Sequence, residues 1–184
     1  MVYSNLSTSE HNLFTDKTVK QIKDILHRHA DKTIGFTASA FDLLHAGHAL
    51  MLKDAKTKCD VLVIALHTDP TINRDSKNKP VLDYSERKIM VECVRYVDEI
   101  IEYATEEDLL HILQTLDPDV RILGSDWKDK PYTGYELPIP VYFHHRDHDY
   151  STTKLRERVY EAELSRRKEC FECRYCGCDA ANKV

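Results

Sequence analysis

The chain has 184 residues, which is enough for one domain with a substantial core and short for two. Its 26 Lys and Arg against 31 Asp and Glu give a formal net charge of -5, so no basic excess points to nucleic acid. The longest purely apolar run, 61–66, is far too short for a membrane span, and the N-terminus has no apolar signal region. We therefore expect a soluble, cytoplasmic protein that binds no nucleic acid.

The first part of the chain predicts a helix followed by a β-α-β unit. The helix is expected to begin after Thr15 and to end near His29. Its apolar face consists of Val19, Ile22, Ile25 and Leu26. A strand at 33–41, a helix from about Ala46 and a buried strand at 61–66 follow. The residues that the second helix is expected to turn inward are Leu50, Met51 and Ala55.

A long loop and a further helix are predicted next. Residues 67–82 are polar, lack periodicity and contain two prolines, and a loop of this length inside a compact domain is often functional. From Asp83 we expect a helix to about 97, with Glu86 placed for a capping box. The expected apolar face of this helix consists of Ile89, Met90, Cys93, Val94 and Val97.

The remaining elements alternate in type and define the fold class. A helix is expected to be capped by Thr105 and to stop before Pro118, and a final helix begins near Thr152. Strands are expected at 99–104, 120–126 and 140–146. This alternation favours a Rossmann-like α/β fold, a parallel sheet with helices on both faces, in which ligands bind at the carboxyl ends of the strands. We expect this single domain at 33–164, between a helical N-terminal extension at 1–32 and a Cys-rich tail at 165–184.

The stretch "FDLLHAGHAL" places His45 and His48 at the end of the first strand and the start of the next helix. A spacing of three puts both rings on one side of the helix. Together with helix N–H groups they would form an anion site, and Gly47 would allow a phosphate to come close to the backbone. The alternative is two solvated histidines at a helix start. A zinc hydrolase is disfavoured, because its helix motif needs histidines four apart with an intervening Glu.

Three other stretches carry polar groups that could bind a ligand. Ser151, Thr152 and Thr153 begin the last helix beside a basic residue, which suits an external anion, although a plain Ser N-cap is the alternative. On their predicted helix, Arg87 and Arg95 are about 80° apart and can reach out of one groove, or they are simply solvated. Asp126 ends a strand and either binds a ribose or base or is a turn aspartate.

In this order and at this spacing, five motifs resemble the HxGH nucleotidyltransferase superfamily, and most closely the glycerol-3-phosphate and phosphoethanolamine cytidylyltransferases. The motifs are "FDLLHAGH", "YSERK", "RYVDEII", "GSDW" and "YSTTK", and they cover about 34–160. The resemblance implies transfer of CMP from CTP to a phosphorylated alcohol, with release of diphosphate and no covalent enzyme intermediate. An adenylyltransferase of the same superfamily and a catalytically weak nucleotide-binding or interaction protein are the alternatives.

The resemblance also implies roles for individual residues. His45 and His48 would hold the α- and β-phosphates, and either Lys77 or Lys79 would close over them. The other positions that match nucleotide-binding ones are Phe41, Asp42, Gly47, Arg87, Arg95, Gly124, Asp126, Arg146, Ser151, Thr152 and Thr153. Arg87 and Arg95 would serve the triphosphate or the acceptor, and Asp126 the nucleoside. A Mg²⁺ would ride on the phosphates, and the protein would be a homodimer.

Two departures from the family pattern leave room for reduced activity or an altered acceptor. Ser39 and Ala40 stand where the family usually has Gly-Thr, and adjacent strand residues point to opposite faces, so Ser39 does not simply replace that threonine. The glycine usual before the Ser-Thr motif is also missing, and His148 and Asp149 lie there instead.

The C-terminal run "CFECRYCGC" contains Cys170, Cys173, Cys176 and Cys178. It is not a disulfide framework spread through a fold. One interpretation is a Zn²⁺ site, although the usual structural pattern separates two Cys pairs by a longer loop. The alternative is a disordered tail of reduced cysteines.

Overall fold

The computed structural model describes residues 14–72 and 78–175, and the side chains up to 168. The chain divides into two compact units, residues 1–149 and 150–184. Lys77, Cys176 and Cys178 lie outside the described residues, as do the side chains of Cys170 and Cys173.

The first unit is built on a sheet of five strands in the order β3-β2-β1-β4-β5. The strands are β1 (Ile34–Ser39), β2 (Val61–His67), β3 (Glu99–Tyr103), β4 (Val120–Gly124) and β5 (Val141–His144). Every neighbouring pair is parallel. The predicted Rossmann-like α/β fold is therefore confirmed, and the strand order reverses between β1 and β4.

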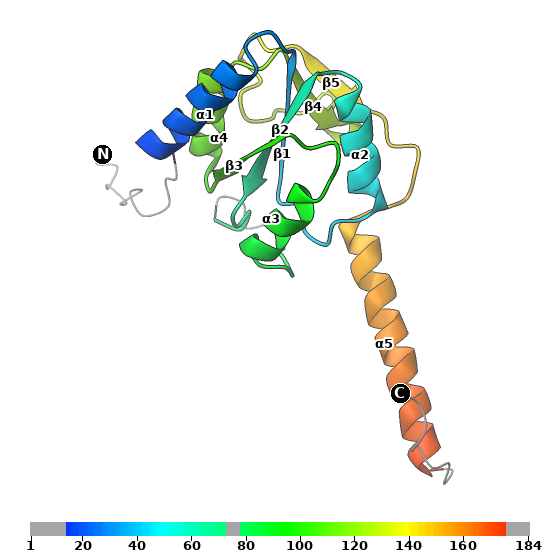
Figure 1. Cartoon of the computed structure of the whole chain (residues 1–184). Coiled ribbons are helices and arrows are strands. Elements are labelled where there is room, and N and C mark those ends of the chain that lie inside the picture. The colour runs from blue at the N-terminus through cyan, green and yellow to red at the C-terminus, as the bar shows by residue number, and fades with distance from the viewer. Residues whose placement is uncertain (1–13, 73–77, 176–184) are drawn as a thin grey trace, which may run out of the picture. The chain divides into compact units, whose positions relative to one another are not determined.

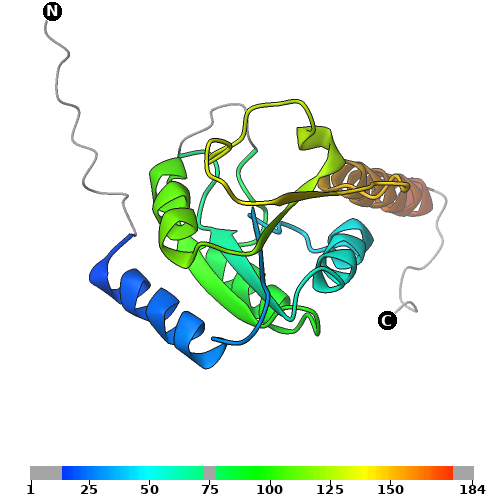
Figure 2. The same cartoon turned by 90° about the horizontal axis from the view of Figure 1, so that it is seen from above.

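Helices cover both faces of this sheet. In the first unit they are α1 (Asp16–Arg28), α2 (Ala46–Lys56), α3 (Tyr84–Glu92) and α4 (Glu106–Leu116), with a short 3-10 turn, η2 (Ser125–Trp127), after β4. Figures 1 and 2 show α1 beside α4 on one side of the sheet and α2 on the other. No helix among residues 14–72 and 78–175 is both long and apolar enough to cross a membrane.

The buried strand β2 explains the two cores. Its residues alternate between the faces of the sheet, and all seven are buried. Val61, Val63 and Ala65 join one hydrophobic cluster with residues of α1 and α4, whereas Leu62, Ile64 and Leu66 join a second cluster with residues of α2 and α3. A strand covered on both faces has no polar alternation, so the continuous apolar run predicted it correctly.

The N-terminal helix contributes to the first of these cores. Ile22 and Ile25 of α1 are fully buried in the cluster that includes Ile112 and Leu113 of α4. Thr105 caps α4, because its side chain accepts a hydrogen bond from the backbone N–H of Asp108, and this prediction is confirmed.

The predicted inward faces of α2 and α3 are partly wrong. In α2, Leu50 is 41% exposed, whereas Leu52 is fully buried. The capping box of Asp83 and Glu86 is confirmed, but α3 ends at Glu92 rather than near 97. Ile89, Met90 and Cys93 are exposed, and the buried residues of α3 are Arg87 and Val91. The hydrophobic pattern indicated the wrong face because a buried arginine, which hydropathy places outside, occupies the inner one.

One tight contact joins β1 to the segment before β2. Gly35 lies against Cys59, and a Cβ atom at Gly35 would lie 2.5 Å from the Cys59 Sγ atom. The same thiol lies 3.5 Å from the carbonyl oxygen of Ala55 at the end of α2. A residue without a side chain is therefore required at position 35.

The second unit contains the helix α5 (Thr152–Tyr175), which confirms the predicted final helix. The helix continues past residue 165, where we expected the Cys-rich tail to begin. Glu163 forms ion pairs with Arg166 and Arg167 on its surface. Cys170 and Cys173 lie within α5.

Candidate functional site

The histidine motif leaves the carboxyl end of β1, next to the point where the strand order reverses. Open parallel sheets bind ligands at this point, because the loops on either side diverge there. The turn that follows β1 contains two non-glycine residues with positive φ, Phe41 at 49° and Leu43 at 47°. Phe41 is buried in the core shared with α2, which holds the turn in this costly backbone conformation.

Ser39 has a local role in this turn. Its hydroxyl oxygen accepts a hydrogen bond of 3.4 Å from the Phe41 N–H, and the carbonyl oxygen of Ala40 accepts one of 2.8 Å from Arg87. The Ser39-Ala40 departure from the family pattern is thus compatible with an ordered turn before the histidines.

His45 and His48 both cap α2 through their Nδ1 atoms. The backbone N–H of Gly47 donates to His45 Nδ1 at 3.0 Å, and the backbone N–H of His45 donates to His48 Nδ1 at 3.4 Å. A neutral imidazole that accepts at Nδ1 carries its proton on Nε2. The rings are stacked, with their centroids 4.0 Å apart. An anion site and a pair of histidines at a helix start are therefore compatible interpretations, because one nitrogen of each ring caps the helix and the other is a donor.

The electrostatic environment favours a neutral His48 ring. Burial, followed by the charges of His45 and Arg146, lowers the pKa of His48 to about 4, and Asp42 opposes this effect. His48 is thus a neutral N–H donor at physiological pH. The charge of Arg146 acts on His48, so this predicted cation lies within electrostatic range of the ring.

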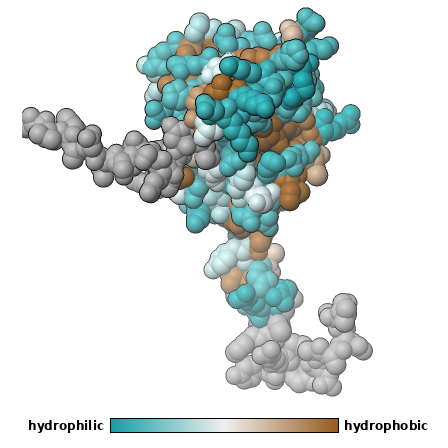
Figure 3. Space-filling view, turned by 60° about the vertical axis from the view of Figure 1, so that its left-hand side comes forward, coloured by the Kyte–Doolittle hydropathy of each residue, from teal (hydrophilic) through white to brown (hydrophobic). Residues whose placement is uncertain are grey.

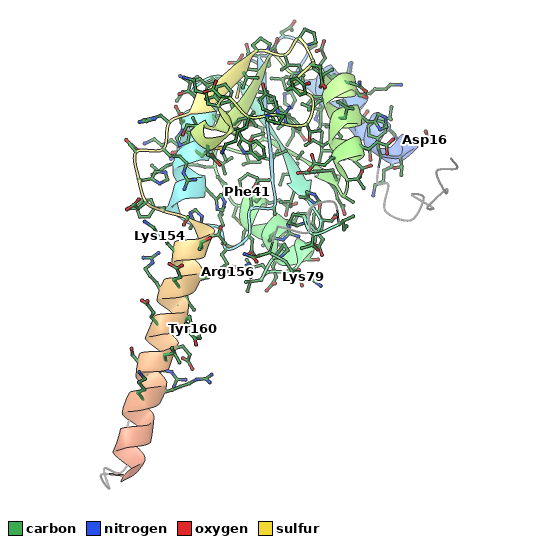
Figure 4. The ribbon with its side chains drawn as sticks, turned by 180° about the vertical axis from the view of Figure 1, so that it is seen from behind. Asp16, Phe41, Lys79, Lys154, Arg156 and Tyr160 are labelled. Carbon is green, nitrogen blue, oxygen red and sulfur yellow. The ribbon has the colours of Figure 1, made fainter. Side chains whose placement is uncertain are left out.

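Asp42 joins the histidine motif to the end of the long loop. Its Oδ1 atom accepts hydrogen bonds from the backbone N–H groups of Val81, at 3.0 Å, and Leu82, at 3.1 Å. Lys79 lies two residues before Val81 and is exposed, so it is anchored close to the motif. Figure 4 shows Phe41 inside the unit and Lys79 at its margin. Asp42 is 8% exposed, and its hydrogen bonds to Val81 and Leu82 favour a structural role in the site.

The two predicted arginines occupy different environments. The expectation that both reach out of one groove from a single helix is wrong. Arg87 is 1% exposed and its guanidinium donates to backbone carbonyl oxygens. Arg95 lies beyond the end of α3, is exposed, and stands 5.4 Å from the centre of the Tyr96 ring.

Gly124 and Asp126 lie at the carboxyl end of β4, across the reversal point from the histidine motif. The Asp126 carboxylate folds back over Gly124, where a Cβ atom would collide with its Oδ1 atom. Asp126 itself is exposed. Both residues therefore lie at the edge of the sheet where the sequence placed them.

The Ser-Thr motif belongs to the second unit. Ser151 has the capping role that was the alternative in the sequence analysis, since its hydroxyl oxygen accepts a hydrogen bond of 3.2 Å from the Lys154 N–H. Thr152 begins α5 and Thr153 is exposed.

A partly buried cluster between α2 and β5 was not predicted. His144 Nδ1 lies 2.6 Å from Asp54 Oδ2, and the Tyr142 hydroxyl donates to the same carboxylate oxygen at 3.0 Å. Burial raises the pKa of Asp54, but the hydrogen bonds from His144 and Tyr142 lower it by more. The cluster fixes α2, and hence its histidine-capped start, against the strand that leads to Arg146. No spacing in the sequence indicates it, because the partners are 90 residues apart.

A comparison with protein families now identifies the domain. Residues 36–158 match a family described as cytidylyltransferase-like. The chain belongs to this family. It therefore carries a nucleotidyltransferase domain of the HxGH type, and the resemblance seen in the sequence motifs is confirmed.

Curated relatives agree with this assignment. The "Bifunctional protein HldE" of Helicobacter pylori (strain HPAG1) is 32% identical over 143 residues, which are 77% of this chain and 30% of the relative. The protein of the same name from Campylobacter jejuni (strain 81116) is 31% identical over 147 residues, 78% of this chain and 32% of the relative. The chain thus spans about a third of the length of the curated relatives it matches.

Solved structures share the fold. A lipopolysaccharide core biosynthesis protein from Thermoplasma volcanium is 26% identical with a TM-score of 0.50, and the match covers 65% of this chain and 99% of that protein. Pantothenate synthetase from Thermus thermophilus is 12% identical with a TM-score of 0.52, and the match covers 70% of this chain and 61% of that one. The second likeness concerns the fold alone.

Substitution of His45 can separate its two roles. In His45→Asn the amide oxygen can still accept the Gly47 N–H, because Asn is among the best N-caps, but the Nε2–H donor is gone. We expect a melting temperature near that of the wild type and diphosphate release lowered about 10²-fold or more. His45→Ala should lose the same activity and, in addition, about 0.5–2 kcal/mol of stability. The matched control is His27→Asn, at an exposed position on α1. Near-normal turnover of His45→Asn would remove this donor from the mechanism.

The lowered pKa of His48 predicts a dependence of stability on pH. The folded protein resists protonation of this ring down to about pH 4, whereas the unfolded chain takes up the proton below about pH 6.5. The free energy of unfolding should therefore be unaffected by His48 above pH 6.5. It should fall between these values, by at most about 1.4 kcal/mol per pH unit. Urea unfolding across this range should show a shallower fall for His48→Asn. An unchanged slope would contradict the assigned neutral state.

Proposed function

We propose that this chain is a cytidylyltransferase that transfers CMP from CTP to a phosphorylated alcohol, such as glycerol 3-phosphate or phosphoethanolamine, and releases diphosphate. The observation that carries the proposal is the stacked pair His45 and His48 after the carboxyl end of β1, whose Nδ1 atoms accept backbone N–H groups, so that in the neutral form each ring has its proton on Nε2. Family membership supports the reaction type.

The proposed reaction is a direct displacement at phosphorus. A phosphate oxygen of the acceptor forms a bond to the α-phosphorus of CTP, the bond from that phosphorus to the bridging oxygen breaks, and the electron pair leaves on diphosphate. The attacking oxygen is already ionised, so no general base is needed. The protein has to hold two anions in line and stabilise the charge that builds on the α- and β-phosphates. Neutral Nε2–H donors and the cation Arg146 suit this task.

The roles proposed for the remaining site residues rest on different observations. Lys79 is anchored near the motif through Val81 and Asp42, which favours it as the lysine that approaches the phosphates. Asp126 and Gly124 lie where a nucleoside would meet the end of β4. Exposed Arg95 remains a candidate for the acceptor or the triphosphate. For Ser151, Thr152 and Thr153 the proposal rests on the family motif, and Ser151 would bind an outer phosphate while it caps α5.

Two metals belong to the proposal. Among residues 14–72 and 78–168, no group of three or more His, Cys, Asp and Glu side chains is arranged to hold a metal ion. A Mg²⁺ carried by the triphosphate needs no such protein cage, and it would neutralise phosphate charge. A Zn²⁺ at Cys170, Cys173, Cys176 and Cys178 rests on the sequence alone.

The proposal also includes the nucleotide base that is recognised and the cellular location of the protein. Phosphate-binding residues do not distinguish cytosine from adenine, so an adenylyltransferase of the same superfamily is a second candidate with comparable support. Cys59 and Cys93 are free thiols, which suits the cytoplasm that we propose.

A diphosphate-release assay tests the reaction. The full chain, with Mg²⁺, is given CTP or ATP and a panel of phosphorylated alcohols. We expect release with CTP and one acceptor, and about 10²-fold less in His48→Asn than in the control His27→Asn. Preference for ATP would replace the cytidylyltransferase by an adenylyltransferase. Nucleotide binding without turnover on the whole panel would favour a catalytically weak nucleotide-binding protein.

We further propose that the protein forms a homodimer through α3. Ile89 and Met90 of α3 and Cys93, directly after it, are all exposed, and Ile89 is 59% exposed. Hydrophobic patches also interrupt the largely hydrophilic surface in Figure 3. An amphipathic helix that turns apolar residues to solvent marks an interaction surface.

Light scattering on the eluting protein tests the dimer. The wild type should have about twice the mass of one chain at micromolar concentration, and Ile89→Lys should convert it to a monomer, because a charge in the core of an interface is costly. The matched control is Tyr135→Lys, at a residue that is also 59% exposed and lies outside α3. A monomeric wild type, or equal effects of both substitutions, would contradict this interface.

A further inference from the structure

Among the described residues of the first unit, Arg87 is the largest charged side chain that is fully buried. Its guanidinium makes four hydrogen bonds, all to backbone carbonyl oxygens. Nε donates to Leu82 at 3.2 Å, Nη1 donates to Ala40 at 2.8 Å and to His67 at 2.6 Å, and Nη2 donates to Thr68. A guanidinium has five N–H donors, so little of it is left for a ligand.

The four carbonyl groups come from three separate parts of the chain. Ala40 lies at the exit of β1, directly before the Phe41 turn. His67 and Thr68 are the exit of β2, where the long loop begins, and Leu82 is the residue at which that loop ends. One side chain therefore closes the loop at both ends and joins it to the start of the histidine motif.

Asp42 strengthens this junction from the other side. It accepts the N–H groups of Val81 and Leu82, and Arg87 binds the Leu82 carbonyl oxygen, so both sides of the Leu82 backbone are held. The acidic groups whose charges act on Arg87 are Asp42, Asp69 and Asp83, and Tyr84 also acts on it. Lys79 lies within the enclosed segment, three residues before Leu82.

We propose that Arg87 is a positioning residue, which gathers the exits of β1 and β2 and the end of the long loop so that Lys79 is presented beside the histidine motif. This differs from a direct contact between Arg87 and a phosphate. Burying a guanidinium is costly. Because Arg87 is buried among carbonyl groups, we infer that its contribution is to organise the segments that carry those groups. The link to catalysis rests on the function proposed above, whereas the link to the loop does not.

Hydrogen exchange tests the link to the loop without any substrate. In Arg87→Lys one ammonium group cannot reach carbonyls on three segments, and in Arg87→Met no donor is left. We expect the amides of Val81 and Leu82 to exchange about tenfold faster or more in both variants, with unchanged exchange in α1 and α4. The matched control is Lys88→Met, at the next residue of α3, whose side chain is 45% exposed and paired with Glu92. Unchanged exchange at Val81 and Leu82, or equal acceleration in every element, would overturn the proposal.

A double-mutant cycle then tests the link to Lys79. Arg87→Lys and Lys79→Ala should each lower kcat/KM by about 10- to 100-fold, and the double variant should lose little more than the more damaging single change. Multiplicative losses would mean that Arg87 acts independently of Lys79, which would overturn its positioning role. If no nucleotide is turned over by the wild type, the proposed function fails, and the exchange experiment still decides whether Arg87 organises the loop.

Discussion

Two hydrogen bonds from backbone N–H groups to imidazole nitrogens determine how the histidine motif can work. The start of a helix has N–H groups without partners, and here Nδ1 of His45 and Nδ1 of His48 accept two of them. This use of Nδ1 fixes the tautomer and directs each Nε2–H away from the helix. Burial and the charge of the stacked His45 ring, 4.0 Å away between centroids, both oppose a positive charge on His48. The same bonds thus stabilise α2 and place the proton of a neutral ring on Nε2.

The surroundings of this pair are organised by backbone groups as much as by side chains. Phe41 and Leu43 adopt positive φ angles, which cost of the order of 1–3 kcal/mol each, and burial of Phe41 helps to offset them. Asp54 joins the last turn of α2 to His144 of β5. The start of α2 is therefore held by a turn on one side and by the hydrogen-bonded carboxylate of Asp54 further along the helix. Rigid support of this kind is what charge stabilisation by fixed donors requires.

The fold could be predicted from the sequence where local pattern and burial agree. The run 61–66 is apolar on both faces because the sheet is covered on both, and the capping residues Asp83 and Thr105 act through contacts three residues away. The prediction failed for α3, because Arg87 takes an inner position that hydropathy assigns to an apolar residue. Its carbonyl partners lie as far as 47 residues away, and no periodicity encodes such contacts. In the site, the histidines, Gly124 and Asp126 could be placed by strand ends, but the Asp54–His144 pair could not.

The contact between Gly35 and Cys59 has a consequence for the chemistry of the thiols. The sulfur atom fills the space beside Gly35, so an alkylating reagent on Cys59 would have to push β1 away. Burial also raises the pKa of this thiol and lowers its reactive thiolate fraction, whereas Cys93, directly after α3, is exposed. Between these two cysteines, a thiol-specific label attaches to Cys93 in the folded protein. The rate at which Cys59 is labelled then measures how often β1 separates from its neighbours.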